Sequence, residues 1–455
     1  MRTNIILSTA LMAVLAACGG AAKTTGGSGL GKGTGVPPPP PTGATAAGDT
    51  EPKRTISEDA KGDYSEASQA FAAADKGPWT ESTCRQVSDK FVAVARTHTT
   101  LVEAQYMAGL SLQRCNLDVD AEKAYQAALK IKPNHGPSLS NLAEIYFSAG
   151  KMDGAKQYWD SAIKANGKLV GARIGVASFE LEEMRRVGIK DAKWKVLEDD
   201  ARFQLSSALG ANSESTAAYT VYGLVYMEGY EKNRNRLDLA KLLLDEAKKR
   251  DEKFAPLQNA YGLFYLHKNQ QSEALQHFQA AVAADPKFVE AHMNVGLTTL
   301  GFRKYDTAKA EFSAVLALQP KNYDAVIGLG AASRGLKDLE GAEAQYKKAI
   351  TIDGRRGEAY YNLAVLYKDF KATKQDPAAS IATYNTAKDF FKQFLEKPSD
   401  DGDKQEAKEQ IATIDKTVTQ VQSYLKAVAS QPQQPAQPAA PATPPATPTA
   451  PATTK

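Results

Sequence analysis

The chain has 455 residues and a formal net charge of +4, from 56 basic and 52 acidic side chains. This near-balance provides no basic stripe and argues against nucleic acid as a partner. Hydrophobic residues make up 43% and charged residues 24%, ordinary values for a soluble protein with a buried core. Three cysteines and five histidines are too few for a disulfide scaffold or a zinc finger. Only eight of the 22 prolines lie between residues 53 and 430, so this long middle segment can be helical.

Residues 1–17 have the character of a secretory signal, with one positive charge followed by an apolar run over residues 5–17. That run is too short to span a membrane. The letters LAAC ending at Cys18 resemble the lipobox of bacterial lipoproteins. This resemblance implies that Cys18 is acylated and becomes the N-terminus, and Gly19 after it favours the outer membrane, facing the periplasm. The alternative is a plain signal peptide with a chance cysteine.

Two segments have compositions that cannot pack a core. Residues 18–57 comprise the predicted lipid anchor and a Gly/Pro-rich linker with a run of five prolines. Residues 430–455 are rich in Pro, Ala, Thr and Gln. We therefore predict a solvated tether at one end and a disordered tail at the other.

A 34-residue period fills the region between them. Small residues recur at this spacing in two series, which are Gly109, Ala143 and Ala177, and then Gly262, Gly296, Gly330 and Ala364, with Gly223 between. In the regular repeats an Ala, an aromatic residue and another small residue follow at fixed offsets, as in Ala308, Phe312 and Val315. These three positions lie on one face of a helix. Each repeat is therefore predicted to be a helical hairpin whose apolar face is covered by the next hairpin.

This pattern resembles the tetratricopeptide repeat. The resemblance implies an all-α fold, a right-handed superhelical solenoid of antiparallel helix pairs, with about eight repeats over residues 102–399. Residues 58–101 are predicted to form a degenerate helical hairpin and residues 400–429 a C-terminal capping helix. Extra residues in the third, fourth and eighth repeats are expected to form loops or longer helices.

The same resemblance implies a partner-binding groove on the concave side, lined by the first helix of each repeat. By register, its apolar positions are Tyr106, Leu110, Phe147, Leu224, Met227, Leu263, Leu266, Met293, Leu297, Leu300, Ile327 and Tyr361. Asn141, Asn294 and Asn362 share another repeat position, at which members of this family often bind the backbone of a ligand. An exposed apolar groove would mark an interaction site. The alternative is that the superhelix closes and buries these side chains itself.

Cys84 and Cys115 lie at equal distances from the turn around residues 97–100. If helices over about 79–97 and 102–115 form an antiparallel hairpin, the two thiols come opposite each other. In an oxidising periplasm this arrangement favours a disulfide. The alternative is a pair of buried, reduced cysteines that act as small apolar residues.

No catalytic motif accompanies the repeats. The chain has no G-x-S-x-G, H-E-x-x-H or C-x-x-C, and the glycines around Lys32 do not form a P-loop. We therefore predict no catalytic residue, metal, cofactor or small-molecule substrate. An enzyme with its site in the inserted segments is the alternative, but these hold carboxylates without a catalytic His, Cys or Ser grouping.

These features predict a non-catalytic scaffold that binds other envelope proteins or peptides and is attached to the membrane by N-terminal acyl chains. The layout is similar to that of lipoproteins in myxobacterial adventurous gliding-motility machines. The overall layout and the composition of the tail favour this role. It is also similar to the smaller pilotin lipoproteins of type IV pilus secretins. An accessory lipoprotein for polysaccharide export or barrel assembly is a further alternative.

Overall fold

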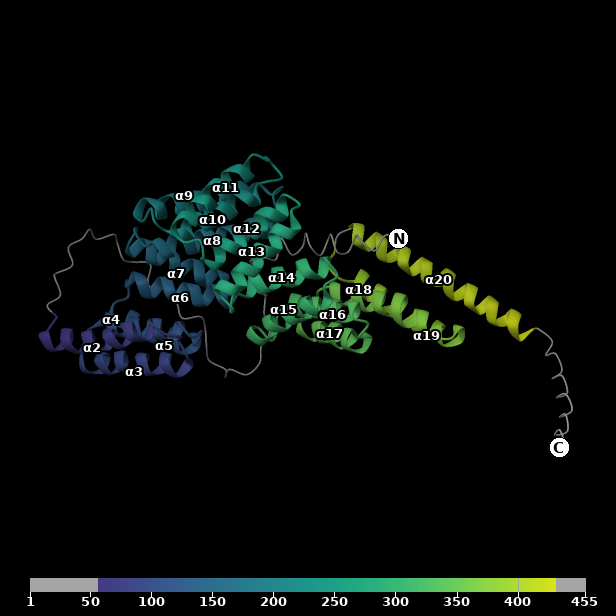
Figure 1. Cartoon of the computed structure of the whole chain (residues 1–455), viewed down its shortest axis with the longest axis horizontal. Coiled ribbons are helices and arrows are strands. Elements are labelled where there is room, and N and C mark those ends of the chain that lie inside the picture. The colour runs from purple at the N-terminus through teal and green to yellow at the C-terminus, as the bar shows by residue number, and fades with distance from the viewer. Residues whose placement is uncertain (1–55, 400, 431–455) are drawn as a thin grey trace, which may run out of the picture. The chain divides into compact units, whose positions relative to one another are not determined.

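The computed structural model describes residues 56–399 and 401–430 (Figure 1). The predicted signal segment, Cys18, most of the linker and nearly all of the Pro-rich tail lie outside the described residues. Within them every regular element is a helix and none is a strand, which confirms the all-α prediction. The chain divides into two units, Met1–Gly354 and Arg355–Lys455, which are treated separately below.

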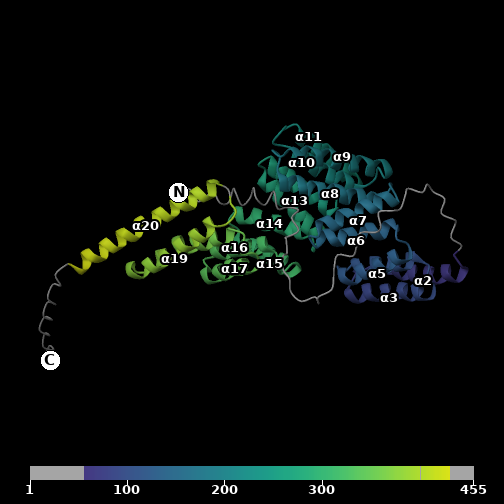
Figure 2. The same ribbon diagram turned by 180° about the vertical axis from the view of Figure 1, so that it is seen from behind.

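The first unit is an array of antiparallel helix pairs, seen from opposite sides in Figures 1 and 2. Its helices are α2 (Glu58–Ala74), α3 (Glu81–Thr97), α4 (Val102–Gln113), α5 (Asp118–Ile131), α6 (Gly136–Ser148), α7 (Met152–Ala165), α8 (Val170–Val187), α9 (Ala192–Ala211), α10 (Thr216–Glu228), α11 (Arg236–Arg250), α12 (Ala255–His267), α13 (Gln271–Ala284), α14 (Val289–Gly301), α15 (Tyr305–Leu318), α16 (Tyr323–Gly335) and α17 (Leu339–Ile352). Each even-numbered helix from α4 onwards packs against the odd-numbered helix that follows it. We call these the first and second helices of a repeat. At the N-terminal end, α3 packs against both α2 and α4 and so continues the array.

The repeated small and aromatic positions form the wall between the helices, as the period predicts. Ala308, Phe312 and Val315 of α15 are each 0% exposed, and the equivalent side chains in the other regular repeats are also buried. The aromatic ring lies against the small residue of the preceding first helix. A β-carbon on Gly330, for example, would lie 2.5 Å from Cε1 of Tyr346. Glycine at this position therefore lets the second helix approach the backbone of the first closely.

Polar side chains begin several helices by accepting a hydrogen bond from a backbone N–H of the first turn. Thr80 does so for α3 and Ser215 for α10, each at 3.2 Å. Asn322 and Asp338 do so for α16 and α17, each at 2.9 Å. These bonds satisfy N–H groups that have no partner inside the helix.

The turn between the two helices of a repeat has its own 34-residue period. Asn116, Asn269, Arg303 and Lys337 have φ between 58° and 66°, and Gly150 has φ 72° at the same repeat position. This left-handed conformation suits Gly and Asn, but it is strained for Arg and Lys. The repeat therefore keeps a left-handed residue in this turn even where that residue is Arg303 or Lys337.

The extra residues of the third and fourth repeats lengthen helices and tie three of them together. Helices α8 and α9 have 18 and 20 residues, against 13 and 14 for α6 and α7. Arg236, at the start of α11, donates to the carboxylate of Glu198, which is 1% exposed on α9. The Nε of Arg236 also donates to the carbonyl oxygen of Tyr226 on α10 at 3.1 Å. Because Glu198 is buried, this pairing offsets the cost of its charge.

The second unit contains α18 (Glu358–Val365), a π-helical turn η1 (Leu366–Lys371), a 3-10 turn η2 (Ala372–Lys374), α19 (Pro377–Leu395) and α20 (Asp401–Ala429). The extra residues of the eighth repeat form the two irregular turns before α19. Helix α20 packs against α19.

Candidate functional site

Most neighbouring first helices of the first unit pack against each other, and we call the surface that the first helices form the inner face. Helix α8 packs against α6 and α10, α10 against α12, and α14 against α16. Within the described residues, no two successive second helices are packed this closely. The array therefore curves towards its first helices, so α4, α6, α8, α10, α12, α14 and α16 lie on its concave side.

The predicted apolar groove residues are largely covered. Tyr106, Leu110, Phe147, Leu224, Leu266, Met293, Leu297, Leu300 and Ile327 are half-buried. The prediction of an exposed position is wrong for Leu263 and Met227, which are 5% and 3% exposed and belong to the core around α12. Packing between neighbouring repeats covers them, so the inner face is not an open apolar groove.

Tyr361 also differs from the prediction. It lies in the second unit, is 7% exposed, and contacts the rings of Phe391 and Phe394. Its hydroxyl donates to Oε1 of Glu406 on α20 at 2.8 Å. The α19–α20 pair therefore covers the side chain that register assigns to a ligand-binding surface.

The three asparagines at the shared repeat position are engaged within the fold. Asn294 is buried and donates to Oδ1 of Asn259 at 2.8 Å, which contradicts a free amide at this position. Asn141 donates to the hydroxyl of Tyr125 at 2.9 Å. Asn362 donates to the carbonyl oxygen of Glu358 at 2.9 Å. All three amides make structural hydrogen bonds between or within helices.

Carboxylates that sequence register did not select lie on the inner face instead. The side chain of Glu144 on α6 is exposed, although desolvation raises its pKa to about 7 against the opposing effect of a hydrogen bond from Gln113. Glu103 of α4 has a buried Oε2 that accepts no hydrogen bond from the described residues. Both side chains can therefore accept a hydrogen bond or a positive charge from a ligand.

Four first helices bring a second group of charges together. Arg185 of α8 bonds to Glu182 at 2.8 Å and to Glu228 of α10 at 3.0 Å. Burial raises the pKa of Glu182, and the nearby carboxylate of Glu290 on α14 raises it further. His267 of α12 lies close enough for Glu228 and Arg185 to act on it, and burial lowers its pKa. One arginine thus faces three carboxylates across this part of the inner face.

Lysine is distributed unequally between the two helices of the repeats. The seven second helices carry twelve lysines in all. The seven described first helices carry none, and they hold eight acidic residues against four arginines. The inner face is therefore acidic although the whole chain has a net charge of +4. This signal is present in the sequence, but residue counts over the whole chain conceal it.

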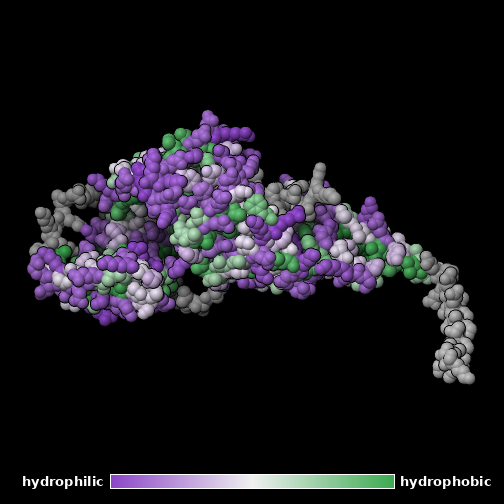
Figure 3. Space-filling view, viewed as in Figure 1, coloured by the Kyte–Doolittle hydropathy of each residue, from purple (hydrophilic) through white to green (hydrophobic). Residues whose placement is uncertain are grey.

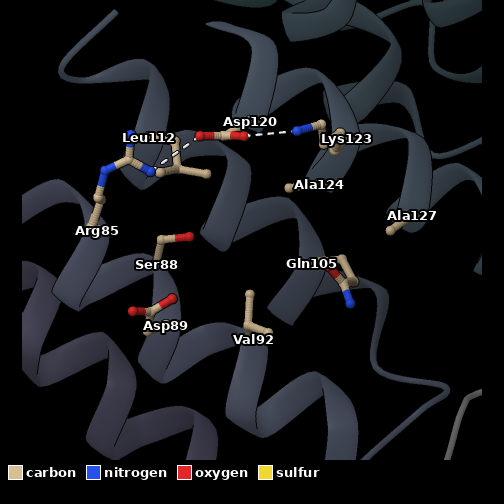
Figure 4. Close-up of a pocket in the computed structure, with 10 residues that line it drawn as sticks. All are labelled: Arg85, Ser88, Asp89, Val92, Gln105, Leu112, Asp120, Lys123, Ala124 and Ala127. Atoms are coloured by element: carbon tan, nitrogen blue, oxygen red, sulfur yellow. Dashed lines mark hydrogen bonds and ion pairs between the residues drawn. The ribbon is translucent and has the colours of Figure 1, made fainter. Parts of the chain in front are cut away.

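A separate pocket of about 420 Å³ lies between α3, α4 and α5 (Figure 4). Asp120 sits on one side, where Nη1 of Arg85 approaches it at 3.1 Å and Nζ of Lys123 at 3.0 Å. Hydrogen bonds from these two cations lower the pKa of Asp120. The remaining lining consists of Ser88, Asp89, Val92, Gln105, Leu112, Ala124 and Ala127. Both cations that line the pocket are thus paired with Asp120.

Cys84 and Cys115 form a disulfide at the ends of α3 and α4, with an S–S distance of 1.97 Å and Cα atoms 6.3 Å apart. The Cα separation falls within the usual range for such bonds. The bond ties the first hairpin to the array. Its presence in protein isolated from cells stays a prediction.

Histidines and acidic residues in the described part of the chain form no group that could hold a metal ion. His292 is instead fixed by Oε2 of Glu311 at 2.6 Å and by the carbonyl oxygen of Pro286 at 3.0 Å. None of the described helices combines the length and the apolar character needed to cross a bilayer.

Helices α9 and α11 carry several exposed large apolar side chains. Val196 and Phe203 of α9 are 69% and 61% exposed, and Leu239 and Leu242 of α11 are 46% and 59% exposed. Figure 3 shows hydrophobic residues over α11 on an otherwise largely hydrophilic region. Other exposed apolar side chains lie singly elsewhere, such as Val119 on α5 and Tyr424 on α20, so the described residues show no single extended apolar patch.

Residues 296–356 match the sequence profile of the tetratricopeptide repeat. The match includes the aromatic wall positions Phe312 and Tyr346 and so agrees with the observed hairpins. No curated protein matches the chain.

Several solved structures are similar to the chain. A thermophilic tetratricopeptide protein from Thermus thermophilus is 18% identical, with a TM-score of 0.38 over 44% of this chain and 99% of that one. The pilF protein of Pseudomonas aeruginosa is 18% identical, with a TM-score of 0.38 over 52% and 99%. The human IFIT1 dimer with m7Gppp-AAAA is 17% identical, with a TM-score of 0.50 over 72% and 76%. At these identities the likeness concerns the fold.

Proposed function

We propose that this chain is a non-catalytic scaffold that binds other proteins through the inner face of its helical repeats. The observation that supports this best is the inner face itself, where half-buried apolar side chains lie beside carboxylates such as Glu144 and Glu103. Apolar contact area with a few polar groups is typical of a surface that binds protein segments. The tetratricopeptide match and the regular hairpins agree with this role.

Nucleic acid is a poorer candidate ligand, although one structural relative is the human IFIT1 dimer with m7Gppp-AAAA. Binding to phosphates depends on lysine and arginine side chains placed along the nucleic acid. The first helices of this chain have no lysine and more acidic than basic residues. Such a surface repels a polyanion.

We further propose that the scaffold is an outer-membrane lipoprotein, anchored through Cys18 and facing the periplasm. The support for this is the lipobox-like LAAC, the following Gly19 and the linker composition. Several acyl chains on one cysteine would give stable attachment, since each buried CH₂ contributes about 0.8 kcal/mol. Cys18→Ser should block processing or release the protein into the periplasm. Membrane fractionation identical to that of wild type would refute the anchor.

Within the envelope, we propose a role in a gliding-motility complex, with a pilotin-like role or an accessory role in polysaccharide export or barrel assembly as alternatives. A deletion strain should lose single-cell gliding and keep pilus-driven movement. Loss of pilus-driven movement alone would favour the pilotin-like role. Intact motility with defective capsule or barrel assembly would favour the remaining alternative.

The scaffold role can be tested on the lipidated protein in its own envelope. Affinity purification after cross-linking should recover defined envelope proteins with wild type. A variant with Glu144→Gln and Glu290→Gln on the inner face should lose them. The matched control, Asp306→Asn with Glu340→Gln, changes two exposed carboxylates of second helices and should retain them. Equal recovery with both variants would place binding elsewhere on the protein.

A further inference from the structure

The segregation of charge within each repeat indicates what kind of segment the inner face accepts. Among helices α4 to α17, lysine occurs only on the second helices. Apart from α8, five of the first helices carry an acidic residue. These acidic residues are Glu103, Glu144, Glu228, Glu290 and Asp324. Apart from α8, the only Lys or Arg on a first helix is Arg334. The first helices other than α8 therefore carry more acidic than basic residues.

Three of these carboxylates lack a basic partner. Glu103, Glu144 and Glu290 make no ion pair with any described residue, whereas Glu228 is bonded to Arg185. An ionised carboxylate in a partly dehydrated concave surface is costly unless a cation joins it. A ligand that brings positive charge removes this cost at each such position.

Apolar side chains lie between these carboxylates. Tyr106 and Leu110 follow Glu103 along α4, and Met293 and Leu297 follow Glu290 along α14. All four are half-buried, so each retains some surface that a ligand can cover. The inner face thus alternates apolar area with negative charge.

We propose that the inner face binds a basic, partly apolar protein segment. Lysine or arginine side chains of this segment would reach Glu144 on α6 and the carboxylates of Glu182 on α8 and Glu290 on α14. This inference rests on the proposed scaffold function and specifies the chemistry of the partner. Complementary charge of this kind selects partners and speeds association more than it adds affinity.

The test uses the full chain and a fluorescent synthetic peptide of repeated Ala-Leu-Lys triplets. Matched peptides carry Gln or Glu in place of Lys. Fluorescence anisotropy should show binding of the Lys peptide that is about tenfold or more tighter than that of the Gln peptide, and that weakens as salt rises. Glu144→Gln with Glu290→Gln should abolish this preference, whereas Asp306→Asn with Glu340→Gln should preserve it.

A carbodiimide, which joins lysine amines to carboxylates, locates the contact directly. Links from the Lys peptide to Glu144 or Glu290 support the inference. Equal binding of the Lys and Gln peptides overturns it, and the scaffold function survives if envelope partners are still captured through the inner face. Links from these glutamates to Lys23, Lys32 or Lys53 would make the N-terminal segment of the chain itself the occupant, and would also overturn the proposal.

Discussion

The ring of Phe312 packs directly onto the backbone of Gly296. A β-carbon on this glycine would lie 2.8 Å from Cε1 of the ring, closer than carbon atoms pack. The same relation joins Gly330 to Tyr346 at 2.5 Å. The distance between the two helices of a repeat is therefore set by the glycine of the first helix, which has no side chain, and by the aromatic ring of the second helix that packs against it.

The first prediction compares two glycines of α14. Gly296→Ala should destabilise the protein by about 1–3 kcal/mol, because the added methyl group forces Phe312 to move in a filled core. Gly301→Ala has nothing within 4 Å of the added atom, so it should be neutral or stabilising by up to about 1 kcal/mol. Urea unfolding followed by circular dichroism measures both changes. Equal effects would show that the ring does not limit helix approach.

A second prediction concerns two leucines that occupy the same repeat position with different burial. Leu263 is 5% exposed in the core, and Leu297 is half-buried on the inner face. Leu263→Ser should destabilise by about 3 kcal/mol or more, comparable to overpacking the wall with Ala308→Leu. Leu297→Ser should cost clearly less and reduce partner binding. Thermal melting ranks the three variants, and a melting temperature for Leu297→Ser as low as that for Leu263→Ser would contradict this order.

The turn between the helices gives a third prediction. Arg303 has φ 58° and Gly150 has φ 72° at the equivalent position. Arg303→Gly should stabilise the protein by about 0.5–1 kcal/mol, because glycine adopts this conformation without strain. Gly150→Ala is the reciprocal change and should destabilise by a similar amount. Opposite shifts of the unfolding midpoint are expected, and shifts of the same sign would exclude backbone strain as the cause.

The sequence predicts the buried small and aromatic positions between the helices better than it predicts the exposure of the inner-face side chains. Ala308 and Phe312 are conspicuous in sequence because close helix packing tolerates only a small residue facing a ring. Leu263 and Leu297 share a register, yet their exposure differs because it depends on how neighbouring repeats pack. Tyr361 is covered by α20, a contact between residues 45 positions apart that no repeat pattern encodes.

The acidic character of the first helices can be predicted from the sequence. The 34-residue period assigns the first and second helices, and only the second helices then carry lysine. The electrostatic effect of Glu290 on Glu182 cannot be predicted from the sequence, because the two residues lie 108 positions apart on α8 and α14 and act on each other only through the folded array. Repeat register therefore locates the surface, and the three-dimensional packing determines which of its side chains remain available.

A fourth prediction follows from a buried carboxylate. Glu180 is 4% exposed, and burial raises its pKa to about 7 against the opposing effect of Lys156, whose Nζ lies 3.8 Å away. A carboxyl with a raised pKa binds its proton more tightly when folded, so its stabilising contribution is present at about pH 4 and lost as the pH rises through 7. Glu180→Gln should therefore match wild type near pH 4 and gain on the order of 3 kcal/mol relative to it by pH 8. Parallel stability curves for the two proteins across this range would refute the raised pKa.

The last prediction concerns the disulfide between Cys84 and Cys115, whose positions are 31 residues apart. A cross-link over this length should stabilise the folded chain by about 3 kcal/mol, because it restricts the unfolded state. Mass spectrometry of thiol-trapped, unreduced protein from cells should find the linked peptides, and two free thiols would refute the bond. In a solenoid each repeat contacts only its neighbours, so Cys84→Ala with Cys115→Ser should loosen one end of the array. Hydrogen exchange should therefore accelerate in α3 and α4 and stay unchanged in α16 and α17. Uniform acceleration along the whole array would show that the bond stabilises one cooperative unit rather than the terminal hairpins.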